Sequence, residues 1–272
     1  MAQDVMNADY NGHTTHRGRS NGLWHNPAHP CPWNRIRDEA IGISFFDDFH
    51  ALDTTDLYVV TQLGGAGTFA LIDDAIGIAD ADAASGTVDQ GVQVQRAGGG
   101  TTGEWLKPAA GKHIWFEGRL SVGDIGADTA PEFFFGISVI DSTTIDGTPI
   151  NTSANHIGFE TVDGAEELKV YGEKAGERST CAAVASTVYP HTLIDFDVTP
   201  TTAWVKLGFY VKGVTAVYFF VNGIHMSAED LATANIPIVE MVPTIVCQTN
   251  ATTDPIVHLD WWAAAQLTQI SP

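Results

Sequence analysis

Hydrophobic and polar residues alternate along much of this 272-residue chain. In residues 112–122, Ile114, Phe116 and Leu120 fall on one side of an extended backbone, while Glu117 and Arg119 fall on the other. This period of two is typical of a β-strand with one buried and one solvated face. The constraint is strong, because a strand with this pattern must place its apolar side against another layer.

The same pattern recurs through the chain and predicts thirteen strands at 55–63, 68–73, 87–97, 112–122, 133–139, 155–162, 166–172, 178–184, 191–198, 203–211, 215–222, 238–248 and 255–267. Asp163-Gly164 and Asn222-Gly223 are typical two-residue hairpin turns. A single helical turn is expected over Ser227–Ala234, and residues 75–86 are expected to form an acidic loop. Many short strands with dense turns predict an all-β antiparallel sandwich or barrel.

Residues 1–40 differ from the rest of the chain in charge and composition. They hold four arginines and four acids, which leaves 9 basic and 29 acidic residues in the other 232, so the remainder carries the whole net charge of -20. With little periodic apolar pattern, this segment cannot bury a core of its own. We therefore expect an extended N-terminal arm at 1–43 and one β-sandwich domain at 44–272. The arm is expected to order against a partner surface through Arg17, Arg19, Trp24, Pro27, Pro30, Trp33, Arg35 and Arg37.

The net charge, the apolar runs and the cysteine count each argue against some partners and cellular locations. A net charge of -20 repels phosphate and anionic lipid, so neither nucleic acid nor a membrane is an expected partner. No run of 18 apolar residues and no secretory signal is found, and three scattered cysteines predict no disulfide framework. These features are typical of a protein made in a reducing cytoplasm.

Short motifs in the predicted domain resemble those of a known class of β-sandwich. Phe45-Phe46-Asp47-Asp48-Phe49 opens the predicted domain, Leu259-Asp260-Trp261-Trp262 closes it, and Val217–Val221 runs into Asn222-Gly223. This order resembles the concanavalin A-like lectin and glucanase sandwiches, also called laminin G-like jelly rolls, over roughly residues 45–267. The resemblance implies a concanavalin A-like jelly roll, and a fold of this kind does not define a function by itself.

Candidate catalytic and metal-binding residues are few. Glycosidases of the resembled fold carry closely spaced carboxylates on one strand, and the nearest match here is Glu160-Thr-Val-Asp163-Gly-Ala-Glu166. Its spacing sends Asp163 to the face opposite Glu160, so we expect solvated acids beside a hairpin, no enzyme and no cofactor. Calcium is the usual ion of such sandwiches, and the weak candidates for a site are Asp73, Asp74, Asp80 and Asp82. No metal is expected there.

Three aromatic residues are expected on the face of the sandwich away from the core: Trp115, Trp204 and Tyr210. Such rings stack on a glycan or are buried under a neighbouring subunit or a second sheet, and burial is favoured.

The arm, the acidic body and the unpaired cysteines together resemble virion proteins of tailed bacteriophages that carry this sandwich as a capsid decoration or cement module. The resemblance implies a non-enzymatic viral structural protein, assembled in the host cytoplasm and located on the virion. Its partners would be the major capsid protein and neighbouring copies of itself in a homo-oligomer. The alternative is a carbohydrate-binding module or adhesin that uses exposed tryptophans and a loop calcium.

Overall fold

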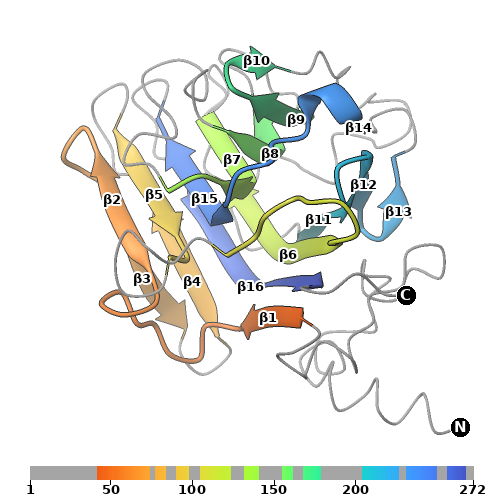
Figure 1. The fold of residues 1–272 in the computed structure, drawn as a ribbon. Helices are drawn as coiled ribbons and strands as arrows, with labels where there is room; N and C mark the ends of the chain where they lie inside the picture. The colour runs from red at the N-terminus through yellow and green to blue at the C-terminus, as the bar shows by residue number, and fades with distance from the viewer. Residues whose placement is uncertain are drawn as a thin grey trace, which may run out of the picture.

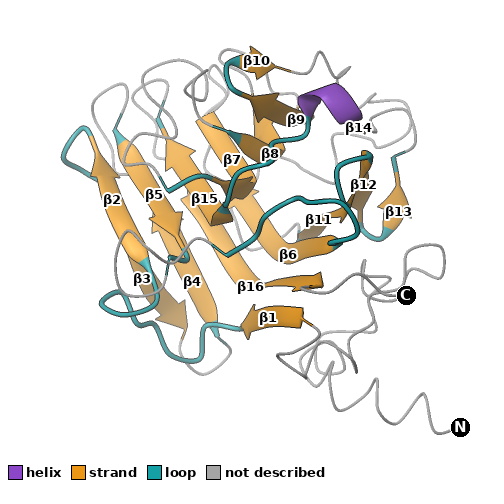
Figure 2. Cartoon of the chain, in the orientation of Figure 1, coloured by secondary structure: helices purple, strands orange, loops and turns teal. Residues whose placement is uncertain are grey.

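The computed structural model describes residues 42–73, 77–83, 90–97, 105–123, 132–140, 155–161, 168–178, 204–226, 231–249 and 256–267. Within these residues the chain forms two antiparallel sheets that lie face to face (Figure 1). Colouring by secondary structure shows how completely strands dominate (Figure 2). The predicted all-β sandwich is confirmed.

The nine-stranded sheet has the order β13-β12-β11-β6-β16-β4-β3, with β1 paired to β16 and β14 paired to β12. Its strands are β1 (Gly42–Asp47), β3 (Thr68–Asp73), β4 (Ile78–Asp82), β6 (Ile114–Gly123), β11 (Val205–Lys212), β12 (Ala216–Val221), β13 (Ile224–His225), β14 (Leu231–Ala232) and β16 (Ile256–Leu267). The seven-stranded sheet has the order β10-β9-β8-β7-β15-β5-β2. Its strands are β2 (Val59–Leu63), β5 (Gly91–Gln95), β7 (Glu132–Ser138), β8 (His156–Thr161), β9 (Leu168–Lys174), β10 (Glu177–Arg178) and β15 (Val242–Gln248).

The core lies between the two sheets, and the predicted alternation places its side chains correctly. Phe116, Phe209 and Phe219 from the nine-stranded sheet meet Phe135 and Phe159 from the other, and all five are 0–1% exposed. The predicted Asn222-Gly223 hairpin turn is also confirmed, since both residues have positive φ angles, 50° and 78°, as a type I′ turn requires.

The opening motif folds into a hydrogen-bonded corner beside β16. Asp47 accepts a 2.9 Å hydrogen bond from the Phe49 backbone N–H and another from the Tyr58 hydroxyl, and Trp262 Nε1 donates to the same hydroxyl at 3.3 Å. Phe49 is fully buried with a φ of 55°, so the turn aims its ring into the core. Asp47 of the motif therefore fixes the entry of the chain into the sandwich.

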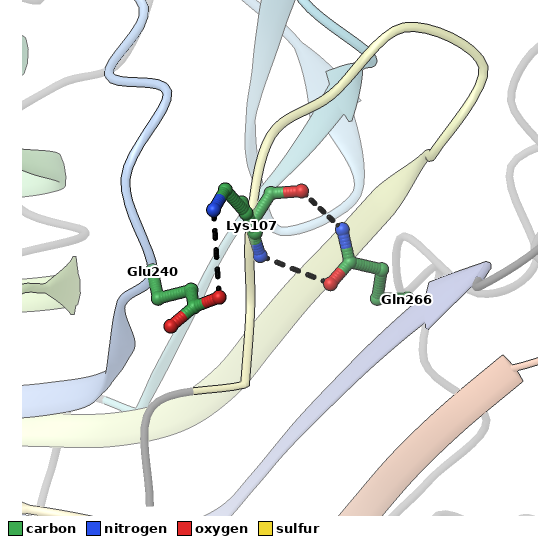
Figure 3. Close-up of polar contacts among 3 residues, drawn as sticks. All are labelled: Lys107, Glu240 and Gln266. Carbon is green, nitrogen blue, oxygen red and sulfur yellow. Dashed lines mark hydrogen bonds and ion pairs between the residues drawn. The ribbon is translucent and has the colours of Figure 1, made fainter. Parts of the chain in front are cut away.

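A strap over Trp105–Lys112 closes one end of the sandwich between the sheets. Leu106 exchanges backbone hydrogen bonds with Met241, at 3.0 and 2.8 Å, just before β15. On the other side, the Gln266 carboxamide bonds the Lys107 backbone N–H and carbonyl at 3.0 and 2.5 Å, while Lys107 Nζ lies 3.4 Å from Glu240 (Figure 3). One peptide unit thus ties the end of β16 to the start of β15.

Two sequence expectations were wrong. Residues 78–82 form β4 rather than part of a loop, because Ala79 and Ala81 face the core while Asp80 and Asp82 alternate with them. Alanine is a weak strand signal, so the alternation was read as small-residue loop sequence. Leu231–Ala232 is β14 and Thr233–Asn235 is a 3-10 helix, where a helical turn was expected. No helix in the described part of the chain has the length and apolar character needed to cross a bilayer.

Replacing Trp262 tests whether the core lies where the structure places it. It is fully buried and its ring lies 5.9–6.4 Å from those of Phe45, Phe49, Tyr58 and Phe135. Trp262→Ala should lower the free energy of unfolding by about 3–5 kcal/mol. Trp204→Ala, at a half-buried ring beneath Arg119, should cost about 1 kcal/mol. Chemical denaturation of both variants measures the difference, and equal losses would contradict the assignment of Trp262 to the core.

Candidate functional site

Polar side chains line the outer face of the seven-stranded sheet, the face turned away from the core. Along β8 the core-facing Ile157 and Phe159 alternate with His156, Gly158 and Glu160, which point outward. The same alternation on the neighbouring strands adds the other members of what we call the acidic face, which comprises Glu132, Phe134, His156, Glu160, Tyr171, Glu173 and Gln248. Each of these side chains is 0–9% exposed.

Strand register brings the members of the acidic face together. Glu173 on β9 is the direct partner of His156 on β8, and Gln248 on β15 is the direct partner of Glu132 on β7. Phe134 is opposite Glu160, which places Glu132 diagonal to Glu160, at a Cα separation of about 7–8 Å. Glu132 is therefore near Glu160 at one end of β8, whereas Glu173 is level with His156, four residues away along that strand.

Two glycines shape the centre of this face. Gly136 and Gly158 are direct partners, and a Cβ added at Gly158 would lie only 2.7 Å from the Phe134 ring. The Phe134 ring occupies the space above Gly158 and meets the His156 ring edge to face at 5.4 Å. The glycine at 158 is thus required for the imidazole and the aromatic ring to touch.

Burying charged carboxylates in the acidic face is unfavourable unless a nearby group or a bound proton offsets the charge. His156 Nε2 lies 3.8 Å from Glu160 Oε2, and both side chains are fully buried. Burial raises the pKa of Glu173 to about 7, because a desolvated carboxylate is disfavoured relative to the neutral acid. Buried ionisable groups with shifted pKa values cluster at functional sites, which makes this face the candidate site.

The acidic face can make several kinds of contact. Carboxylate oxygens accept hydrogen bonds from hydroxyl groups, the Gln248 carboxamide donates and accepts, and the Phe134 and Tyr171 rings offer apolar surface. Carboxylates on adjacent strands are also the groups used in general acid–base chemistry. Among the described residues, no group of three or more His, Cys, Asp or Glu side chains has the arrangement that holds a metal ion.

Sequence reasoning placed the candidate aromatic residues elsewhere. Trp115 and Tyr210 do lie on the outer face of the nine-stranded sheet, where their rings stack at 5.2 Å, but they are 3% and 8% exposed. They are therefore not the exposed platform that stacking on a glycan needs. Trp204 belongs to a different group, since the Arg119 guanidinium lies 4.7 Å above its ring and bonds Asp260 at 2.5 Å.

The described acidic candidates come from two neighbouring strands. Asp80 and Asp82 lie on β4, and Asp73 ends β3 at the other end of that strand pair. Burial, with a contribution from Asp82, raises the pKa of Asp80 to about 7, and His258 Nε2 lies 3.9 Å from its carboxyl oxygen. Outside the described residues lie Asp74, Asp163, Glu166 and the arm candidates Arg17, Arg19, Trp24, Pro27, Pro30, Trp33, Arg35 and Arg37.

Glu160 was the one member of the acidic face that the sequence analysis named as a candidate. The motif grouped it with residues other than those that surround it in the structure. The motif joined it to Asp163 and Glu166, whereas in the structure it contacts His156 on its own strand and has Phe134 as its direct partner on β7. The available signal was the outward alternation of His156 and Glu160 on the predicted strand 155–162, while Glu132 and Glu173 lie one residue beyond the predicted strands 133–139 and 166–172.

Comparisons with known proteins show which solved structures share this fold. No protein-family model matches the sequence, and no curated protein matches it. A protein of unknown function from Shewanella oneidensis, SO2946, is similar in structure with a TM-score of 0.52 at 11% identity, covering 89% of this chain and 96% of that chain. Peanut lectin gives 0.51 at 10% identity over 84% of this chain and 99% of that chain. The cellulose induced protein Cip1 gives 0.50 at 10% identity over 81% and 96%.

These likenesses, at identities of 10–11%, concern the fold alone. The chain has a concanavalin A-like β-sandwich, and the fold expected from the sequence motifs is confirmed.

The raised pKa of Glu173 predicts how stability depends on pH. The buried carboxyl binds its proton more tightly in the folded protein than in the unfolded chain, so its contribution is complete below about pH 4.5 and is lost as the pH rises through 7. Glu173→Gln removes this titration, and the variant should gain stability relative to the wild type between pH 5 and pH 8. Urea denaturation at both pH values measures the change. The exposed-site control Glu240→Gln should show no such shift, and a parallel profile for both variants would contradict the assignment.

Proposed function

We propose that this protein binds a saccharide chain on the acidic face of its seven-stranded sheet. The observation that carries the proposal is the fully buried pair of His156 and Glu160, whose side chains lie 3.8 Å apart beside the Phe134 ring, with the buried Glu173 directly opposite His156 on the next strand. Peanut lectin, a lectin by name, has a similar sandwich, which agrees with this proposal.

Polyols suit this set of side chains. Saccharide hydroxyls donate hydrogen bonds to carboxylates, and charge-assisted hydrogen bonds of this kind are stronger than neutral ones. Phe134 is the direct partner of Glu160 and Tyr171 that of Gly158, so both rings can offer apolar surface to the C–H faces of a sugar bound here. A negative face also disfavours anionic ligands, so a neutral saccharide is the class of ligand proposed.

The burial of the acidic face adds a kinetic expectation. Its carboxyl groups are 0–2% exposed, so a ligand reaches them only after a conformational change. Binding that requires such a change is slower than a simple diffusional encounter. Stopped-flow or surface binding measurements should therefore show an association rate that saturates with ligand concentration.

The direct test is a glycan array and polysaccharide pull-down with the wild-type chain, followed by isothermal titration of the retained glycan. Glu160→Gln should weaken binding by about 10- to 100-fold, because one charge-assisted hydrogen bond contributes roughly 1.5–3 kcal/mol. Glu240→Gln makes the same chemical change at a half-exposed carboxyl near the strap and should bind as the wild type does.

Two results would overturn the proposal: no retained glycan, or equal binding by Glu160→Gln and wild type. Release of reducing sugar from a retained polysaccharide would instead identify the acidic face as catalytic. That assay also tests the sequence expectation that the chain is not an enzyme, which stays a prediction.

The predicted role as a capsid decoration protein rests on the arm, which lies outside the described residues. The comparisons do not bear on it, and it stays a hypothesis together with its capsid partner, its homo-oligomer and its place on a virion. Deletion of residues 1–40 tests it, because a decoration protein would lose binding to purified capsids while its sandwich still folds.

A further inference from the structure

A second apolar cluster lies on the outer face of the nine-stranded sheet. We call it the aromatic patch, and it comprises Trp115, Tyr210, Tyr218, Phe220, Ala265 and Leu267. The Trp115 and Tyr210 rings stack at 5.2 Å, and the Tyr210 and Tyr218 rings at 5.9 Å. These stacked rings cross from β6 through β11 to β12.

The aromatic patch is buried although it faces away from the core. Phe220 is 1% exposed, Trp115 is 3% exposed and Tyr210 is 8% exposed. The strands that the structure describes form only two layers, and the seven-stranded sheet packs on the opposite face. Neighbours such as His113, whose ring stacks on Tyr210 at 5.5 Å, lie beside these rings on the same face of the sheet. A cover from elsewhere in the same chain is therefore implied.

The N-terminal arm enters the fold at this patch. Gly42, the first residue of β1, is the direct partner of Leu267, which is itself a member of the patch. Crossing from β16 to β12 takes three strand spacings, about 14 Å. The 41 residues before Gly42 span up to about 135 Å when extended, so the arm has ample length.

The composition of the arm matches the patch. Trp24 and Trp33 flank three prolines in residues 24–33, a sequence that favours a polyproline II conformation. Proline-rich segments of this kind dock in grooves lined by aromatic rings at little cost in conformational entropy. Residues 268–272, which follow Leu267, have one large apolar residue, Ile270, too few to cover three rings.

The distribution of charge also favours the N-terminal arm as the segment that covers the aromatic patch. The chain beyond residue 40 carries the whole net charge of -20, whereas the arm is neutral and has four arginines. An arm without net negative charge is repelled less by the acidic body than a second copy of the whole chain would be.

We propose that residues 24–33 of the arm dock on the aromatic patch of their own chain. The sandwich then carries its N-terminal segment as a third layer over β6, β11 and β12. A second copy of the chain and a separate large partner are the competing occupants, and the experiment below separates them from the arm.

Disulfide trapping tests this docking with the natural Cys31 of the arm. Tyr218→Cys places a thiol in the patch, and Ile72→Cys places one on β3 at the far edge of the same sheet, where the side chain is 49% exposed. Both variants carry Cys181→Ser, while Cys247 is fully buried and stays. After mild oxidation of the full chain at low concentration, mass spectrometry measures the Cys31 disulfides.

The expected result is an intramolecular disulfide between Cys31 and the thiol at position 218, at least tenfold more abundant than that at position 72. Equal trapping at the two positions, or none at 218, would overturn the proposal. A disulfide found only between chains, shown by mixing isotopically light and heavy protein, would assign the patch to a second copy. His225→Cys, whose ring contacts Tyr218 and Phe220, repeats the test if Tyr218→Cys does not fold.

Discussion

Both faces of each sheet are withdrawn from water in the middle of this sandwich, and the rest of the structure follows from that constraint. Every residue of β5, β7 and β15 is buried, whether it points toward the core or away from it. In a simple two-layer sandwich the outward positions are solvated, and polar side chains there carry little energetic consequence. Here each outward residue must either be apolar or have hydrogen-bond or charge partners that offset the free-energy cost of its burial.

The two sheets meet this constraint in different ways. The outer face of the nine-stranded sheet holds stacked aromatic rings, whose burial is favourable without any further partner. The outer face of the seven-stranded sheet holds carboxyl groups, an imidazole and carboxamides, whose burial is costly. Both faces are equally buried, and we interpret the first as a structural surface and the second as the proposed ligand site.

Much of the fold could be predicted from the sequence, and the failures have identifiable causes. Ile114, Phe116 and Leu120 were placed in the core by alternation alone, because period two fixes the face of a side chain. The strand at 78–82 was missed because alanines carry its apolar face. Alternation also put Trp115 on the correct face, and the favoured prediction that the ring is buried agrees with its 3% exposure, but alternation gives no information on what covers it. The acidic face was missed because Phe134 and Glu173 join His156 and Glu160 from other strands, and the order of strands is not visible in a single sequence.

The position of β16 in the chain has a consequence for synthesis. This strand joins β6, β4 and β1, and its residue Leu267 pairs with Gly42, 225 positions earlier. A ribosome adding 5–20 residues per second needs roughly 10–45 s to make that stretch, and long-range pairing of this kind forms slowly in any case. Until then the aromatic sides of the earlier strands have no completed partner layer. A nascent chain of this protein is therefore a natural client for chaperones that shield exposed strands.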